Sequence, residues 1–121
     1  MKILVPSITF LALLVSFSSC DDRDDNLTGP NIRIHNRSSQ NFSRVEVRVD
    51  TLSFENVSSN GFSDYLEFDV AYQKDTLRIE ADSTTINFVP DSISNPLPIG
   101  LYTYQLDIDD EGELIFNFKI D

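Results

Sequence analysis

The sequence predicts an all-β domain over residues 31–121, an antiparallel β-sandwich of seven or eight strands. Two observations support this. Apolar residues recur at every second position in short runs, and no window keeps the 3.6-residue period of an amphipathic helix. Turn-forming residues separate the runs at regular intervals, as is typical of sandwiches. Nine Phe and four Tyr supply apolar mass for one small core.

The first predicted strands each have one apolar and one polar face. Residues 32–35 read IRIH and residues 44–49 read RVEVRV. Such strands pack one face on a core in an antiparallel sheet. The next apolar pair, Leu52 and Phe54, has the opposite parity, so we expect a turn or bulge at residues 50–51 to reset the register.

The middle of the chain predicts a hairpin and then a long connection. Residues 66–72 and 77–81 alternate in the same way, and we expect residues 73–75 to join them. A short strand over residues 86–88 follows. The stretch VPDSISNPLP, residues 89–98, contains three prolines, which cannot donate to a central ladder, so it is predicted to be a connection.

The last predicted hairpin joins residues 102–108 to residues 114–120 through DDEGE. The stretch NPLPIGLYTYQLDI, which leads into it, resembles the approach to the sixth strand of fibronectin type III and immunoglobulin-like domains. The resemblance implies an immunoglobulin-like sandwich in which Tyr102 or Tyr104 bonds back across the corner. The alternative is that both tyrosines are ordinary core residues.

The N-terminal segment has the three-part pattern of a secretory signal peptide. Residues 1–19 carry Lys2, then an apolar stretch, then small residues. The apolar stretch is short and interrupted by Pro6, Ser7 and Thr9, whereas a membrane span needs about 20 apolar residues. We therefore expect this segment to be removed.

Cys20 is the only cysteine of the chain, so it cannot form an intramolecular disulfide. Residues 17–20, FSSC, resemble the lipobox of bacterial lipoproteins, in which Leu is usual where Phe17 stands. In that family the cysteine sulfur receives a diacylglycerol and the signal peptide is cut just before it. The resemblance implies that Cys20 anchors the chain in a membrane, because two or three acyl chains hold a protein stably. The alternative is an ordinary secretory signal with an incidental cysteine.

Residues 20–30 are predicted to form an acidic, flexible tether with Gly and Pro. Its aspartates are Asp21, Asp22, Asp24 and Asp25. This run resembles the export signal of Bacteroidota surface lipoproteins, which implies an outer-membrane protein facing the cell exterior. The alternative is a solvated spacer on the periplasmic face.

The mature chain also resembles small Bacteroidota lipoproteins to which no activity is assigned. The features that match are the SxY segment at residues 63–65 and the GxYTY strand at residues 100–104. This resemblance implies location and fold only.

The charge of the chain limits its partners. Asp and Glu number 20 against 9 Lys and Arg, giving a formal charge of −11. Nucleic acid and anionic membrane surfaces are therefore excluded as expected partners of the folded part. We expect a monomeric domain that touches the membrane only through its lipid anchor.

Catalytic chemistry finds little support in the composition. His35 is the only histidine, and the chain has no cysteine apart from Cys20, which is the expected lipid anchor. These residues are too few for a zinc site of His and Cys. A hydrolase with a Ser-His-Asp arrangement would have to use His35. We expect a surface histidine, no enzyme activity and no cofactor.

The most ligand-like string is DIDDEGE, residues 107–113. Asp107, Asp109 and Glu111 partly imitate the opening of an EF-hand loop, but Phe118 stands where its final Glu belongs. We expect no metal site, only weak candidates, and a hairpin turn with Gly112 at positive φ.

Four triplets resemble the acceptor of the O-glycosylation system of the same bacterial group, which is Asp, then Ser or Thr, then an apolar residue. They make Thr51, Thr76, Ser83 and Ser92 candidate acceptors. The alternative is that polar turn residues before strands generate the same strings.

Phe42, Phe62 and Tyr65 fall outside the clean alternation. They are a candidate aromatic platform for a ligand, or else they plug the ends of the sandwich. The expected function is a non-catalytic binding or interaction module that recruits a protein or glycan, although the lack of Trp weakens the glycan case. The alternatives are a structural accessory subunit of an envelope complex or, less favoured, a hydrolase.

Overall fold

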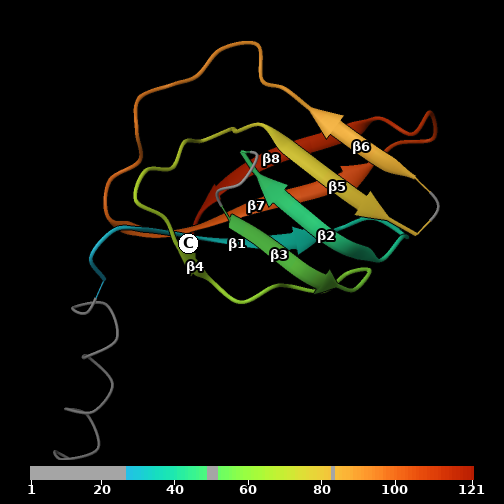
Figure 1. Ribbon diagram of the computed structural model, residues 1–121, viewed down its shortest axis with the longest axis horizontal. Coiled ribbons are helices and arrows are strands. Elements are labelled where there is room, and N and C mark those ends of the chain that lie inside the picture. Colours follow the sequence, from blue (N-terminus) through green and yellow to red (C-terminus); the bar gives the residue numbers. More distant parts are fainter. Residues whose placement is uncertain (1–26, 49–51, 83) are drawn as a thin grey trace, which may run out of the picture.

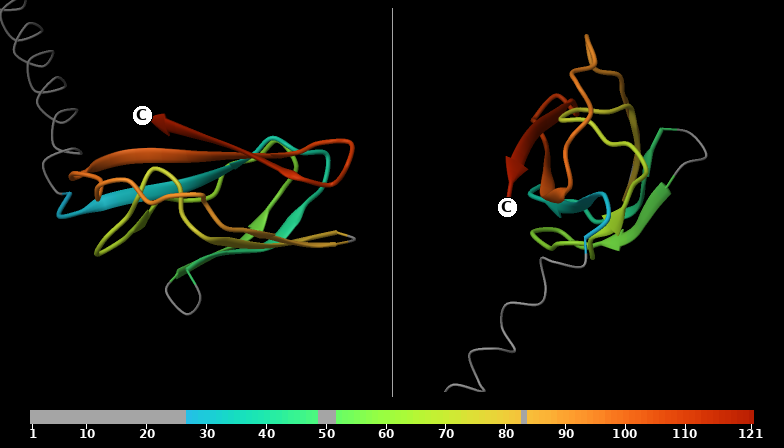
Figure 2. Two further views of the ribbon diagram at one scale, coloured as in Figure 1. Left: turned by 90° about the horizontal axis from the view of Figure 1, so that it is seen from above. Right: turned by 90° about the vertical axis from the view of Figure 1, so that its left-hand side faces the viewer.

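The computed structural model describes residues 27–48, 52–82 and 84–121. Over these ranges the chain forms eight strands in two four-stranded sheets, stacked as two layers (Figure 1; Figure 2). The predicted all-β sandwich is confirmed. No helix in this part of the chain is long and apolar enough to cross a membrane.

Each sheet contains four strands. The first has the order β4-β1-β7-β8, with β1 (Pro30–Asn36), β4 (Leu66–Glu67), β7 (Gly100–Ile108) and β8 (Leu114–Ile120). The second has the order β3-β2-β5-β6, with β2 (Phe42–Val47), β3 (Leu52–Val57), β5 (Leu77–Ala81) and β6 (Thr85–Phe88).

One pairing is parallel, against the antiparallel prediction. β1 runs beside β7 in the same direction, with Ile32 opposite Tyr102 and Ile34 opposite Tyr104. β2 belongs to the other sheet, so the chain changes layer directly after its first strand (Figure 1). Alternation shows which face of a strand is buried but not which strand lies beside it, which is why this pairing was not predicted.

The predicted change of parity before Leu52 coincides with a hairpin. β2 and β3 pair antiparallel, and Val47 lies opposite Leu52. The connection therefore spans residues 48–51, of which residues 49–51 lie outside the described residues.

The predicted strand over residues 66–72 is wrong beyond its first two residues, and so is its hairpin with residues 77–81. β4 pairs with β1, whereas β5 pairs with β2 in the opposite sheet. Residues 68–76 therefore cross between the layers. Phe68 is buried on this path, but Val70, which has the same predicted parity, is 40% exposed.

The predicted bond across the corner is present at Tyr102. Its hydroxyl donates to the carbonyl of Pro98 at 2.8 Å, four residues upstream. A Cβ atom at Gly100 would lie 3.0 Å from this hydroxyl, so glycine leaves room for the ring. Tyr104 is fully buried, and its hydroxyl donates to the carbonyl of Tyr72 at 2.5 Å, which ties β7 to the crossing segment.

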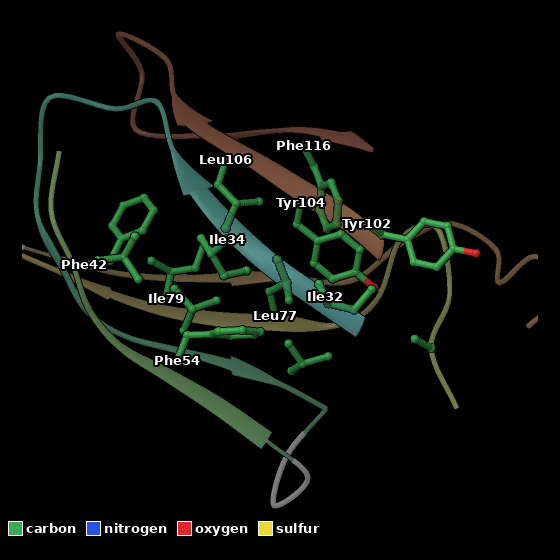
Figure 3. Packing of buried hydrophobic residues seen from close by; sticks show 14 of the residues in the cluster. Ile32, Ile34, Phe42, Phe54, Leu77, Ile79, Tyr102, Tyr104, Leu106 and Phe116 are labelled. Atoms are coloured by element: carbon green, nitrogen blue, oxygen red, sulfur yellow. The ribbon is translucent and has the colours of Figure 1, made fainter. Parts of the chain in front are cut away.

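The core lies between the two sheets and is built from side chains of both (Figure 3). Ile34 and Leu106 enter it from the first sheet, and Val45 and Ile79 from the second; all four are fully buried. Each such side chain contributes about 1.5–3 kcal/mol by leaving water. This packing holds the layers together.

Phe68→Ala tests the path of the crossing segment. Phe68 is buried and its ring centroid lies 6.4 Å from that of Phe54, so truncation should lower the free energy of unfolding of the purified full chain by about 3–5 kcal/mol. Val70→Ala is the matched control and should change it by less than about 0.5 kcal/mol. Urea denaturation measures both. Equal losses for the two variants would contradict this path.

Candidate functional site

The outer face of the β4-β1-β7-β8 sheet gathers basic and aromatic side chains. Arg33 and His35 point outward because Ile32 and Ile34, which alternate with them, fill the core. We call this group the basic-aromatic face, and it comprises Arg33, His35, Arg37, Phe62, Tyr65 and Lys119.

Pairing of three strands builds the face. Arg33 lies opposite Thr103 on β7, and Thr103 lies opposite Lys119 on β8, so these three residues form one row across the sheet. In the next row His35 lies opposite Gln105. The row exists because β1 pairs with β7, so the same feature that departs from prediction creates the site.

Phe62 is held beside β1 by the segment that precedes β4. Its ring stacks on that of His35, with centroids 3.9 Å apart and planes 10° apart. Ser63 fixes the segment, because its amide donates to the carbonyl of Ile34 and its hydroxyl accepts from the amide of Ile34, both at 2.8 Å. Phe62 nevertheless stays 52% exposed.

Arg33 lies against two aromatic rings. Its guanidinium carbon is 4.3 Å from the ring centroid of Phe62 and 5.0 Å from that of Tyr65. Exposed contacts of this kind contribute about 0.5–1 kcal/mol each. The Nε atom also donates to Thr103 Oγ1 at 3.0 Å, which fixes the orientation of the guanidinium.

Asp121 anchors the same network. Its Oδ2 atom accepts from the hydroxyls of Tyr65 and Thr103, both at 2.6 Å, and lies 3.7 Å from Nε of Arg33. Burial, followed by the bond to Asp121, raises the pKa of Tyr65 above its usual 10.0. Tyr65 therefore acts here as a neutral hydrogen-bond donor.

The basic side chains on the two outer faces of the sandwich have different cross-strand neighbours. On the second sheet, Arg44 Nη2 is 3.4 Å from Glu55 Oε1, and Arg78 lies opposite Glu46. On the first sheet the cross-strand neighbours of Arg33 and His35 are Thr103 and Gln105, which are neutral. Asp121 lies 3.7 Å from Arg33 on this face, so Arg37 and Lys119 are its cations that have no ion-pair partner within 4 Å among the described residues.

The pKa of His35 is affected by the cations of this face. Its pKa is lowered from 6.5, first by burial and then by the charges of Arg37, Arg33 and Lys119. The imidazole is therefore neutral at pH 7, as suits a ring stacked on Phe62. Its Nδ1 atom is buried and has no hydrogen-bond partner among the described residues.

The structure brings together two of the three residues of the predicted aromatic platform. Phe62 and Tyr65 lie beside Arg33, as described above. The prediction is wrong for Phe42, which is fully buried in the core. A shift of register between Phe42 and Arg44 changes the parity of β2, which explains why Phe42 falls outside the alternation.

The DIDDEGE string forms the predicted hairpin turn. The Oδ1 atom of Asp109 accepts from the amides of Glu111 and Glu113, both at 2.9 Å, and Gly112 has φ 82°. Asp107, the third acidic candidate, uses its Oδ1 atom to accept from the following amide at 2.8 Å. Among the residues with described positions, no group of three His, Cys, Asp or Glu side chains is suited to hold a metal ion.

The other predicted modification sites differ in accessibility. Ser92 is exposed in the connection between β6 and β7, whereas Thr76 is half-buried and follows the fully buried Asp75. The remaining sites lie outside the described residues: Cys20, Asp21, Asp22, Asp24, Asp25, Thr51 and Ser83.

A buried ion pair was missed at the sequence level. Asp75 Oδ2 lies 3.1 Å from Nε of Arg48, and Asp75 is fully buried although it sits in a polar stretch that suggests a turn. Burial raises the pKa of Asp75, while Arg48 opposes this effect. Burial, together with the charge of Asp75, also raises the pKa of Tyr104. The pair joins the end of β2 to the crossing segment, so its role is structural.

Comparison with known proteins adds no family: no family model matches the chain, and no curated protein matches it. The geometry and charge of the basic-aromatic face are therefore the basis for a functional proposal.

The titration of His35 tests the geometry of this face. We expect its NMR midpoint in the full chain to lie below 6.5 and to rise in Arg37→Gln and in Lys119→Gln, because each removes a nearby positive charge. Arg44→Gln, on the other sheet, is the control and should leave the midpoint unchanged. Because the folded pKa is depressed, this group should cost stability as the pH falls below 6.5. An unchanged midpoint in both test variants would show that Arg37 and Lys119 are not beside His35.

Proposed function

We propose that the chain is a non-catalytic interaction module, held at the outer membrane by a lipid on Cys20, and that it binds a protein partner through the basic-aromatic face. The observation that carries the proposal is the half-exposed ring of Phe62, held between His35 and Arg33 on an otherwise acidic protein. Arg, Tyr and Phe are enriched at protein–protein interfaces, and Arg and Tyr are common among the residues that contribute most of the binding energy.

The arrangement is preorganised for binding. Arg33 is fixed by Thr103, and the hydroxyl of Tyr65 by Asp121, so these side chains lose little freedom when a partner arrives. The ring of Phe62 is stacked on one neighbour and still presents apolar surface to solvent. A non-catalytic role is favoured because His35 is stacked on Phe62 and flanked by cations rather than held beside a nucleophile.

The proposed anchor suits this role. A lipid on Cys20 and a tether of about ten residues would keep the domain within about 35 Å of the membrane surface, since an extended chain spans at most about 3.5 Å per residue. The acidic run after Cys20 supports display on the cell exterior, and exposure of Ser92 supports glycosylation there. The bond from Tyr102 to Pro98 supports an immunoglobulin-like sandwich, although the parallel pairing of β1 is a departure from that pattern.

Two variants distinguish membrane anchoring from export: Cys20→Ala, and the replacement of the four aspartates of the acidic run by Asn. Cys20→Ala should release the chain from membranes, because no acyl chain can be attached without the sulfur. Changing Asp21, Asp22, Asp24 and Asp25 to Asn should leave it on membranes but protect it from protease added to whole cells. Fractionation and immunoblotting measure both. Membrane retention of Cys20→Ala would contradict the anchor, and equal digestion of the Asn variant and wild type would contradict the export signal.

A photo-crosslinking residue in place of Phe62 tests the binding face in living cells. We expect it to capture one discrete protein, whereas the same residue in place of Val89, which is 72% exposed away from the face, should not. Adding Arg33→Gln should reduce the captured product strongly, because it removes the cation that lies against the rings of Phe62 and Tyr65. A product of equal yield from both positions, or none from either, would contradict a protein-binding role for this face.

A further inference from the structure

β8 leaves one edge of its sheet without a partner. It is the last strand in the order β4-β1-β7-β8, and no other strand of the described ranges pairs with its outer side. It lies at the margin of the molecule in both views of Figure 2. Its seven residues, LIFNFKI, include one charge and no proline, and edges of this kind are usually protected because they accept further strands.

The hydrogen bonds of β8 show which groups are unpaired. The amide of Asp121 donates to the carbonyl of Leu101 at 3.0 Å, and the carbonyl of Glu113 accepts from the amide of Asp109 at 2.9 Å. In an antiparallel ladder, residues of one parity bond to the same neighbour, so the odd-numbered residues of β8 bond to β7. The even-numbered residues therefore direct their amides and carbonyls to the free edge.

The apolar side chains of β8 on the core side are incompletely covered. Phe116 is buried, Phe118 is half-buried, and Ile120 is 73% exposed although its parity directs it inward. On the same flank, Phe88 of the edge strand β6 packs on Phe116 with centroids 5.3 Å apart. This flank has apolar surface that the domain itself does not bury.

The outer side of β8 has a different chemistry. Lys119 ends the row that begins with Arg33 and Thr103, and a strand added beside β8 would place its own residue next in that row. An acidic side chain there would lie beside Lys119, and opposite charges on neighbouring strands are favourable.

We propose that the free edge of β8 accepts a strand from a protein partner, with apolar residues toward Phe118 and Ile120 and an acidic residue beside Lys119. The partner adds main-chain hydrogen bonds to the even-numbered residues, and its alternating side chains supply specificity. This inference deepens the proposed function, because it identifies the bound part of the partner as a β-strand. It rests on that function only for the claim that a protein partner is bound in the cell. β8 itself contains no acidic residue; in a second copy only the flanking Glu113 or Asp121 could meet Lys119, and Asp121 already accepts from Tyr65 and Thr103, so a separate chain with an acidic residue inside its strand is the occupant proposed.

Two synthetic peptides test this proposal with the purified full chain in detergent micelles. One is a capped nine-residue alternation of Val and Glu; the other has Lys in place of Glu. We expect only the Glu peptide to bind, and to slow amide hydrogen exchange at Leu114, Phe116, Phe118 and Ile120. The amides of the odd-numbered residues should exchange slowly before and after addition, because they already bond to β7.

A charge-reversal pair separates this site from general electrostatics. Lys119→Glu should weaken binding of the Glu peptide about fivefold and allow the Lys peptide to bind, because cross-strand charge pairs have effects of this order. Arg78 is an exposed basic residue of β5, in the other sheet; Arg78→Glu is the matched control and should change neither. Lys119→Gln gives the same test with a smaller change if the reversal disturbs folding.

Three results would overturn the proposal: no protection of the even-numbered amides, equal binding of the two peptides, or amides already protected in the free chain because copies pair through β8. Each is distinct from failure of the proposed function, which is decided by capture at Phe62.

Discussion

The parallel pairing of β1 with β7 is the interaction on which the rest of the structure depends. Seven residue pairs, from Pro30 opposite Gly100 to Asn36 opposite Leu106, join the first strand to the hairpin at the end of the chain. Of the strands between them, only the short β4 stays in this sheet, and β2, β3, β5 and β6 form the second layer. The two layers and the change of layer after β1 follow from that pairing.

The same pairing has consequences on both faces of the sheet. On the inner face it places Ile34 beside Tyr104, whose hydroxyl bonds to the crossing segment, so the two layers are also joined through a hydrogen bond. On the outer face it places Arg33 in line with Thr103 and Lys119. The core and the proposed binding face are therefore two sides of one set of contacts.

Local pattern predicted which side chains face the core wherever a strand is regular, although Ile120, at the end of the edge strand β8, faces inward and is still 73% exposed. Where it failed, a long-range interaction was responsible: a register shift buries Phe42, and an ion pair with Arg48 buries Asp75 in a stretch that reads as a turn. For the site, the position of Phe62 and Tyr65 outside the alternating core pattern could be predicted from the sequence. The contribution of Lys119 to the site could not be predicted, because the alternation along a strand does not show which other strand pairs with it.

The most direct measurement is the set of nuclear Overhauser effects between backbone protons of β1 and those of other strands. Parallel pairing should give contacts from residues 31–35 to residues 101–105 that advance together along both strands. Contacts from β1 to β2, in an antiparallel order, would instead place β1 in the other sheet, and neither the row ending at Lys119 nor the proposed binding face would then exist.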